Sequence, residues 1–285
     1  MTEPTIISVS TLNQALKAMA ERNVVAVAGG TDVLVELHDV IDRPWPRLLV
    51  LEGIKPLHKI TVRGGRVVLG PLVSFAEIQN SALLKRFAPQ LVEAASVVGS
   101  VLIRNRGTIG GNVAFASPAG DLIPPLFVLS ARLELSSIKG RRWVPIGDFF
   151  KGPGATILRK NELITSIALE KTGSHGFFLR LAARRALAIT KVSVTADLSM
   201  RQKKVSRIRI ALGAVAPTVV RAMRTEECLL GKELTEDCIS AACYMAKNEA
   251  RPITDIRSDA DYRREMVAVL LRRGLSRIAD SGRQS

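Results

Sequence analysis

The sequence predicts an α+β protein of two domains, residues 1–172 and 173–285. In the first domain, short helical and strand patterns are mixed. In the second, three strand-like runs come first and three helical segments follow, which is typical of a sheet with helices on one face. Between the domains, Lys171-Thr172-Gly173-Ser174 has the composition of a linker. Because 47% of the 285 residues are hydrophobic, the chain has ample material for buried cores.

The first lobe of the first domain, about residues 1–54, begins with an amphipathic helix. Ser10 or Thr11 can cap it, and the apolar residues of 12–19 recur at the i, i+3, i+4, i+7 spacing. The further elements expected in this lobe are strands over 24–28 and 47–51 and a short helix over 32–37. The earlier of the two strands runs directly into Gly29, so it presents a glycine turn at its end.

The second lobe, about residues 55–172, opens with a predicted hairpin that turns at Gly64-Gly65. Ser74 and Glu77 have the spacing of a capping box, which indicates the start of a helix. The further elements expected are hairpin strands over 58–62 and 66–69, helices over 89–98 and after 121, strands over 132–136, 142–146 and 162–169, and a turn at 152–154. Adjacent prolines at 124 and 125 fit only the first turn of their helix.

The second domain is expected to fold as a sheet followed by helices. Its elements are strands over 177–182, 191–200 and 205–213 and helices over about 225–230, 235–249 and 259–278.

Charge is unevenly distributed along the chain, whose formal net charge is +15. Residues 141–210 contain fifteen Lys and Arg against four Asp and Glu. Such a region can attract an acidic protein, a dianionic cofactor or nucleic acid, or it can be a solvated basic face. With 4% aromatic residues and no recognition-helix, RNP or zinc-finger signature, we expect no nucleic-acid partner.

The three cysteines, Cys228, Cys238 and Cys243, form no CxxC pair. Together with three scattered histidines they offer neither a four-thiolate cluster site nor a zinc site, so we expect no metal on this chain and buried free thiols instead. The sequence also shows no apolar run of eighteen residues and no signal-peptide pattern at its N-terminus. We therefore expect a cytoplasmic protein without a membrane span.

Two stretches contain adjacent glycines. The first is AGGTD, around Gly29 and Gly30, and the second is RNRGTIGGNVAFASPAGD, around Gly110 and Gly111. Adjacent glycines let the backbone approach a ligand, and successive N–H groups in such a turn can bind an anion. A single Gly-Gly turn is more often a hairpin or a helix cap, but two of them suggest two loops that grip one phosphate-rich ligand. Neither matches GxGxxG or GxxxxGK[ST], so neither a Rossmann nor a P-loop site is indicated.

This pair of motifs resembles the FAD-binding subunit of the molybdenum hydroxylases, the family of xanthine dehydrogenase and carbon monoxide dehydrogenase. The resemblance extends to the C-terminal part, where Ala211 to Thr218 and Arg221 look like the last domain of these subunits. It implies a two-lobed FAD-binding domain of the PCMH (vanillyl-alcohol-oxidase-like) type, followed by the sheet-plus-helices domain.

The resemblance also implies which residues lie around the FAD. These are Val27, Ala28, Gly29, Gly30, Thr31, Asp32, Val33 and Leu34 in the first motif, Thr108, Ile109, Gly110, Gly111, Asn112, Ser117 and Asp121 in the second, and Leu163 and Arg180 beyond them. The glycine N–H groups would face the pyrophosphate, and Asp121 would accept hydrogen bonds from hydroxyl groups of the cofactor. Arg180 stands where many relatives have Lys, and Phe115 where relatives often have Asn, so we expect Phe115 to serve packing.

No nucleophile–base pair or catalytic triad emerges from the sequence, which suits a subunit whose chemistry belongs to its cofactor. By resemblance, a large partner subunit carries the molybdenum cofactor and a small one carries two [2Fe-2S] clusters, in a dimer of heterotrimers. FAD would pass electrons from the clusters to NAD⁺, oxygen or a quinone-type acceptor, and the basic residues of 141–210 would help to dock the small subunit. The stretch after the first motif looks closer to xanthine dehydrogenase.

Two alternatives stay open at this point. One is a stand-alone flavin reductase of the same fold, and the other is a cofactor-free basic binding or scaffold protein.

Overall fold

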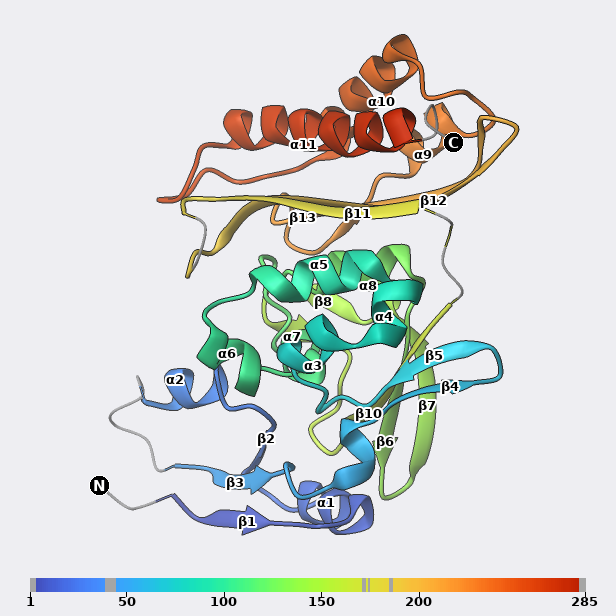
Figure 1. Ribbon diagram of the computed structural model, residues 1–285. Coiled ribbons are helices and arrows are strands. Elements are labelled where there is room, and N and C mark those ends of the chain that lie inside the picture. The colour runs from blue at the N-terminus through green and yellow to red at the C-terminus, as the bar shows by residue number, and fades with distance from the viewer. Residues whose placement is uncertain (1–3, 39–44, 171–172, 174, 185–186, 282–285) are drawn as a thin grey trace.

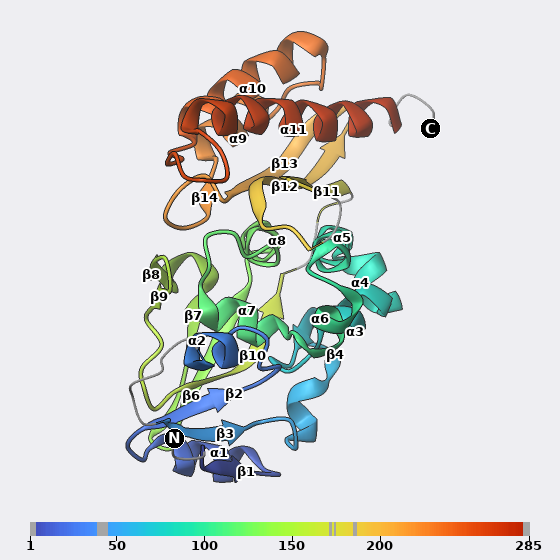
Figure 2. The ribbon, with the colours of Figure 1, turned by 90° about the vertical axis from the view of Figure 1, so that its left-hand side faces the viewer.

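The computed structural model describes residues 4–38, 45–170, 173, 175–184 and 187–281. The predicted linker over 171–174 lies outside these residues, apart from Gly173. Figures 1 and 2 show three bodies stacked along one axis, which follow one another in the sequence: a small first lobe, a larger second lobe and the C-terminal part.

The first lobe is a small parallel sheet covered by one helix. The strands, in spatial order β1-β3-β2, and the helices are β1 (Ile6–Ser8), β3 (Arg47–Val50), β2 (Val24–Val27), α1 (Leu12–Met19) and α2 (Val33–His38). Thr11 caps α1 through a capping box with Gln14, since the Thr11 hydroxyl accepts from the Gln14 N–H at 3.3 Å. The helix, both strands and the short helix that follows the glycine turn confirm the predictions.

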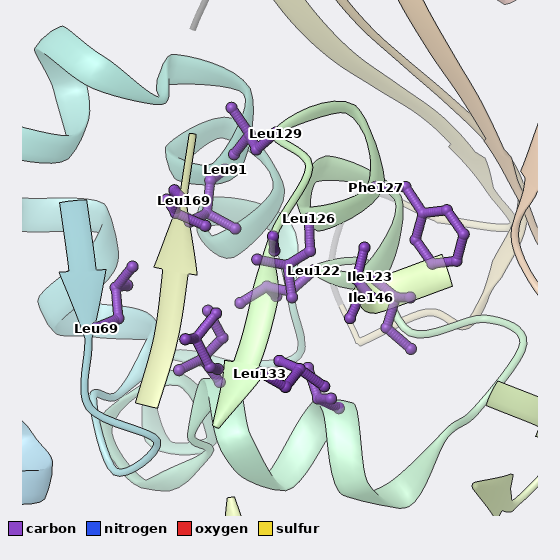
Figure 3. Close-up of a cluster of buried hydrophobic side chains, with 14 of the residues drawn as sticks. Leu69, Leu91, Leu122, Ile123, Leu126, Phe127, Leu129, Leu133, Ile146 and Leu169 are labelled. Atoms are coloured by element: carbon purple, nitrogen blue, oxygen red, sulfur yellow. The ribbon is translucent and has the colours of Figure 1, made fainter. Parts of the chain in front are cut away.

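The second lobe is built on a five-stranded antiparallel sheet with helices packed on it. The strands, in order β4-β5-β10-β6-β7, are β4 (Ile60–Arg63), β5 (Arg66–Leu69), β10 (Leu163–Leu169), β6 (Arg132–Ser137) and β7 (Gly140–Pro145). The helices are η1 (Lys55–His58), α3 (Phe75–Asn80), α4 (Ala82–Phe87), α5 (Pro89–Val97), α6 (Val101–Arg106), α7 (Ile109–Phe115), α8 (Ile123–Val128) and η2 (Ile146–Asp148), and β8 (Phe150–Gly152) pairs with β9 (Ala155–Thr156). Figure 3 shows the core between the sheet and α8, where Leu122, Leu126 and Leu133 are fully buried.

Most of the predicted elements of this lobe are confirmed, including the capping box at Ser74, whose backbone N–H donates to Glu77 Oε2 at 2.7 Å. Three short helices, α4, α6 and α7, were not predicted. The error matters most for α7, because the second glycine motif is not a turn. Gly110 and Gly111 lie in the first turn of a helix, although glycine disfavours helix by about 1 kcal/mol relative to alanine.

The C-terminal part is an antiparallel sheet covered on both faces. Its strands, in order β11-β12-β13-β14, and its helices are β11 (His175–Ala182), β12 (Thr190–Arg201), β13 (Lys204–Gly213), β14 (Val220–Arg221), α9 (Met223–Leu229), α10 (Glu236–Glu249) and α11 (Ala260–Ser281). The three predicted strands and three helices are confirmed. Helices α9, α10 and α11 cover one face, and α5 and α8 of the second lobe lie against the other (Figures 1 and 2).

The contact between the second lobe and this sheet combines apolar packing with hydrogen bonds. The Phe178 N–H donates to Glu93 Oε2 at 2.7 Å, and Gln90 Nε2 donates to Asp197 Oδ1 at 3.2 Å. Near α8, the Ala214 N–H donates to the Pro118 carbonyl at 3.0 Å. The two parts are therefore held in register by directional bonds as well as by apolar packing.

Candidate functional site

A cleft of about 890 Å³ opens between the first and second lobes. Most of its lining comes from three segments, which lie in 19–36, 108–115 and 156–164. Its volume falls within the range of about 300–1,000 Å³ that is usual for small-molecule and cofactor sites. The two glycine motifs, some eighty residues apart in the sequence, meet at this cleft.

The first glycine motif offers free hydrogen-bond donors at the wall of the cleft. Within the described part of the chain, the N–H groups of Gly29, Gly30, Thr31 and Asp32 donate to no protein acceptor. Gly30 adopts φ +78°, which favours glycine, and its carbonyl accepts from the Leu34 N–H at 3.3 Å as α2 begins. Successive free N–H groups of this kind form an anion-binding concavity.

The N–H groups of the second motif are already engaged by the protein. The Gly110 N–H donates to the Pro71 carbonyl at 2.8 Å, and the Gly111 N–H donates to Thr108 Oγ1 at 3.1 Å, as in an N-cap. The expectation that both motifs present backbone donors to one anion is therefore wrong for the second. What α7 contributes to the cleft is shape and side chains.

The glycines serve different purposes. A Cβ on Gly29 would lie 1.9 Å from the Arg106 carbonyl oxygen, and one on Gly110 would lie 2.5 Å from Pro71 Cβ. Both glycines thus allow close packing within the protein. At Gly111 the nearest atom to an added Cβ would be Thr108 Oγ1 at 3.0 Å, with nothing else within 4 Å. An added Cβ at Gly111 would therefore meet only the Thr108 hydroxyl, whereas one at Gly110 would meet the backbone and ring of Pro71.

Two side chains of α7 give the cleft a polar and an aromatic feature. Asn112 lines the cleft, and its Oδ1 is buried without a hydrogen-bond partner among the described residues. This oxygen has almost no exposed surface, so it faces the protein, whereas the Asn112 side chain as a whole is half-buried at the cleft wall. Phe115 also lines the cleft and is half-buried. That Phe115 serves packing stays a prediction, and its place in the cleft lining also makes its ring available to a ligand.

The structure brings most of the predicted site residues together at the cleft. Those that line it are Ala28, Gly29, Gly30, Thr31, Asp32, Val33, Thr108, Gly110, Gly111, Asn112 and Leu163. Burial raises the pKa of Asp32 above its ordinary value, and the Thr31 hydroxyl, which donates to it at 3.4 Å, opposes that rise.

The remaining predicted residues lie elsewhere. Val27 is buried in β2, and Ile109 belongs to the core of the second lobe. Leu34 is exposed on α2, and the Ser117 hydroxyl accepts from the Ala119 N–H at 3.3 Å in a turn. None of these four side chains is part of the cleft lining.

Asp121 and Arg180 also lie outside the cleft lining and form a buried ion pair with each other. Arg180 Nη1 donates to Asp121 Oδ2 at 2.6 Å, and the Thr190 hydroxyl donates to Asp121 Oδ1 at 2.6 Å. Arg180 Nη2 donates to the Val97 carbonyl at 2.5 Å. Burial raises the pKa of Asp121 to about 6, against the opposing effects of Arg180 and Thr190. The pair thus joins the second lobe to β11 and β12.

The structure adds a wall that the sequence did not reveal. Thr156 lines the cleft from the end of β9, and Leu158, Arg159 and Lys160 line it from the loop between β9 and β10. This loop has no glycine motif and no charge pattern that distinguishes it from other surface loops, so only the fold places it opposite the first motif.

The described residues contain neither a membrane-spanning helix nor a metal-binding group. No helix there is long and apolar enough to cross a membrane. No group of three or more His, Cys, Asp or Glu side chains in the described ranges could hold a metal ion.

Comparison with known proteins places the cleft in context. Residues 2–170 match the family model described as the FAD binding domain in molybdopterin dehydrogenase, and residues 177–278 match the CO dehydrogenase flavoprotein C-terminal domain. The glyceraldehyde dehydrogenase medium chain of Sulfolobus acidocaldarius is 30% identical, over 94% of this chain and 95% of that protein. The xanthine dehydrogenase FAD-binding subunit of Escherichia coli O157:H7 is 27% identical, over 94% and 93%. A solved carbon monoxide dehydrogenase from Hydrogenophaga pseudoflava matches with a TM-score of 0.91 and 28% identity, over 96% of both chains.

Proposed function

The chain belongs to the FAD-binding medium subunits of the molybdenum hydroxylase family, and from this membership we propose that its cleft holds FAD for electron transfer within a multi-subunit oxidoreductase. The observation that carries the assignment is the run of free N–H groups from Gly29 to Asp32 at the wall of a cleft of suitable volume. They suit the pyrophosphate, because an anion would satisfy donors that the protein leaves free.

The rest of the cleft suits the other parts of FAD. Asn112 lines the cleft and would offer its side-chain amide to the cofactor. Leu163 and Val33 provide apolar walls, and Phe115 adds an aromatic one for a planar ring system. When bound, FAD supplies the ability to accept electrons singly and to release them in pairs. The residues of this chain bind and orient the cofactor and limit the access of water to it.

The finer assignments are part of the same proposal. Electrons would arrive from [2Fe-2S] clusters of a small partner subunit, while a large subunit would carry the molybdenum cofactor, in a dimer of heterotrimers. NAD⁺, oxygen or a quinone-type compound would be the acceptor. The chain would consist of an FAD-binding domain over 1–172, with lobes of about 1–54 and 55–172, and a C-terminal domain over 173–285. The basic residues of 141–210 would form the docking region for the small subunit.

The test is to purify the chain and identify the flavin that denaturation releases. We expect FAD in roughly equimolar amount. Asn112→Leu removes the side-chain amide at nearly constant volume, so we expect FAD to bind about tenfold more weakly, as for a lost hydrogen bond of about 1.4 kcal/mol. Asn80→Leu, at the exposed end of α3, is the matched control. If neither the purified chain nor the chain with added FAD retained flavin, the proposal would be wrong.

A further inference from the structure

An ion pair with a buried carboxylate anchors the loop that forms the third wall of the cleft. Arg142, on β7, donates from Nε to Glu162 Oε1 and from Nη2 to Glu162 Oε2, both at 2.8 Å. Glu162 is 4% exposed, whereas the Arg142 side chain is 34% exposed. Two parallel bonds between a guanidinium and a carboxylate fix direction as well as distance.

The same two side chains also hold the loop backbone. Arg142 Nη2 donates to the Ile157 carbonyl at 3.0 Å. At the other end, Glu162 Oε2 accepts from the Arg159 N–H at 2.9 Å, and the Glu162 N–H donates to the Arg159 carbonyl at 2.9 Å. Residues 157–162 are thus fastened at both ends to one ion pair.

This loop lines the cleft on one side and packs on the core of the second lobe through Ile157 and Leu158. Leu158, Arg159 and Glu162 line the cleft, whereas Arg142 lies on the edge strand of the five-stranded sheet. The Arg142 guanidinium holds the pKa of Glu162 below its ordinary value, so the pair is ionised at neutral pH. Loss of the pair would remove the polar anchors of the loop and leave it held by the apolar packing of Ile157 and Leu158.

We propose that Arg142 and Glu162 form a positioning pair, which keeps loop 157–162 closed against bound FAD and so sets how fast the cofactor leaves. The inference rests on the proposed function, because it requires FAD in this cleft. Neither residue was singled out by the sequence, and Arg142 itself does not line the cleft. It acts on the cofactor only through the loop.

The test compares neighbouring arginines. Arg142→Met removes the fork at similar length, and Arg141→Met is the matched control, because Arg141 lies on the same strand, is 76% exposed and pairs with Glu134. The FAD dissociation rate is followed by the rise in flavin fluorescence on release. We expect it to increase about tenfold or more for Arg142→Met, as for other truncated buried charge pairs, and to stay within about twofold for Arg141→Met.

A second readout reports loop opening without the cofactor. Arg159 and Lys160 are trypsin sites within the loop, so limited proteolysis of the FAD-free chain, read by fragment mass, measures its local opening. We expect faster cleavage at these two sites in Arg142→Met and in Arg142→Lys, which keeps the charge but not the fork.

The two readouts together separate a positioning role of the Arg142–Glu162 pair from a general stabilising role. Faster FAD release with cleavage confined to the loop supports the inference, in either variant. Unchanged release and cleavage in both variants overturn it, as does cleavage spread over the whole chain with a lowered unfolding midpoint, which would make the pair a general stabiliser. Absence of FAD from the unmodified chain would instead contradict the proposed function.

Discussion

Replacing Arg180 with Met tests whether the buried ion pair stabilises the junction between the second lobe and the C-terminal sheet. The Arg180 side chain is 8% exposed and Asp121 is 7% exposed. The substitution would leave Asp121 and the Val97 carbonyl without a donor that the native fold supplies.

The size of the effect follows from these contacts. Removing one partner of a buried ion pair costs about 3–5 kcal/mol. The lower end applies here, because the pKa of Asp121 is already raised to about 6 and a further rise lets the carboxyl become neutral near pH 7. We therefore expect Arg180→Met to lower the free energy of unfolding by about 3 kcal/mol. We expect Arg180→Lys to lower it by about 1–2 kcal/mol, because the ammonium cannot reach both Asp121 Oδ2 and the Val97 carbonyl.

The assay is urea unfolding at pH 7, followed by circular dichroism. Arg184→Met is the control, because Arg184 is exposed and, among the residues that the structure describes, bonds only to the Leu187 carbonyl, at 2.7 and 3.1 Å. We expect this control to change stability by less than about 0.5 kcal/mol. If Arg180→Met fell within about 1 kcal/mol of the control, the buried pair would contribute little net stability and the reasoning from burial would be refuted.

Two more predictions follow from the cleft and from Asp121. Gly29→Ala should destabilise the chain by more than about 2 kcal/mol because its Cβ would meet the Arg106 carbonyl oxygen, whereas Gly111→Ala should leave the urea midpoint nearly unchanged; equal midpoints would contradict the packing argument. Between pH about 4 and about 6, the folded protein retains a proton on Asp121 that the unfolded chain releases, so the stability of the native chain relative to Asp121→Asn should fall as pH rises, by up to about 3 kcal/mol. If the relative stability rose with pH instead, Arg180 would lower the pKa of Asp121 by more than burial raises it.

The sequence predicts the elements whose signals are local. The capping box at Ser74, the apolar spacing of the helix before Met19 and the glycine turn of the hairpin are each contained within a few residues, and each is where it was expected. Helix α7 was missed because two glycines outweigh its Thr108 cap in any local account. Its first turn is stabilised by the carbonyls of Pro71 and Val73, which come from a distant strand–helix connection.

The site was predictable to the extent that it follows the motifs. The first glycine motif was expected to face an anion, and its free N–H groups agree with that expectation. The loop around Arg159 and the pairing of Arg142 with Glu162 depend on which strands become neighbours, and nothing in the sequence near either residue encodes that. The same holds for Asp121 and Arg180, which are 59 residues apart. Long-range pairs between oppositely charged residues have no local signature.

The polar contacts between α5 and the C-terminal sheet have a consequence for how such subunits can be recombined. Gln90 and Glu93 on α5 bond to Asp197 and to the Phe178 N–H, so docking depends on a few matched donors and acceptors. A C-terminal domain grafted from a relative would need a carboxylate at the position of Asp197 and a cation at the position of Arg180 to reproduce these bonds. A graft without the carboxylate would leave the Gln90 amide buried and unsatisfied. Compatibility between halves of hybrid subunits therefore reduces to the residue types at a small number of positions.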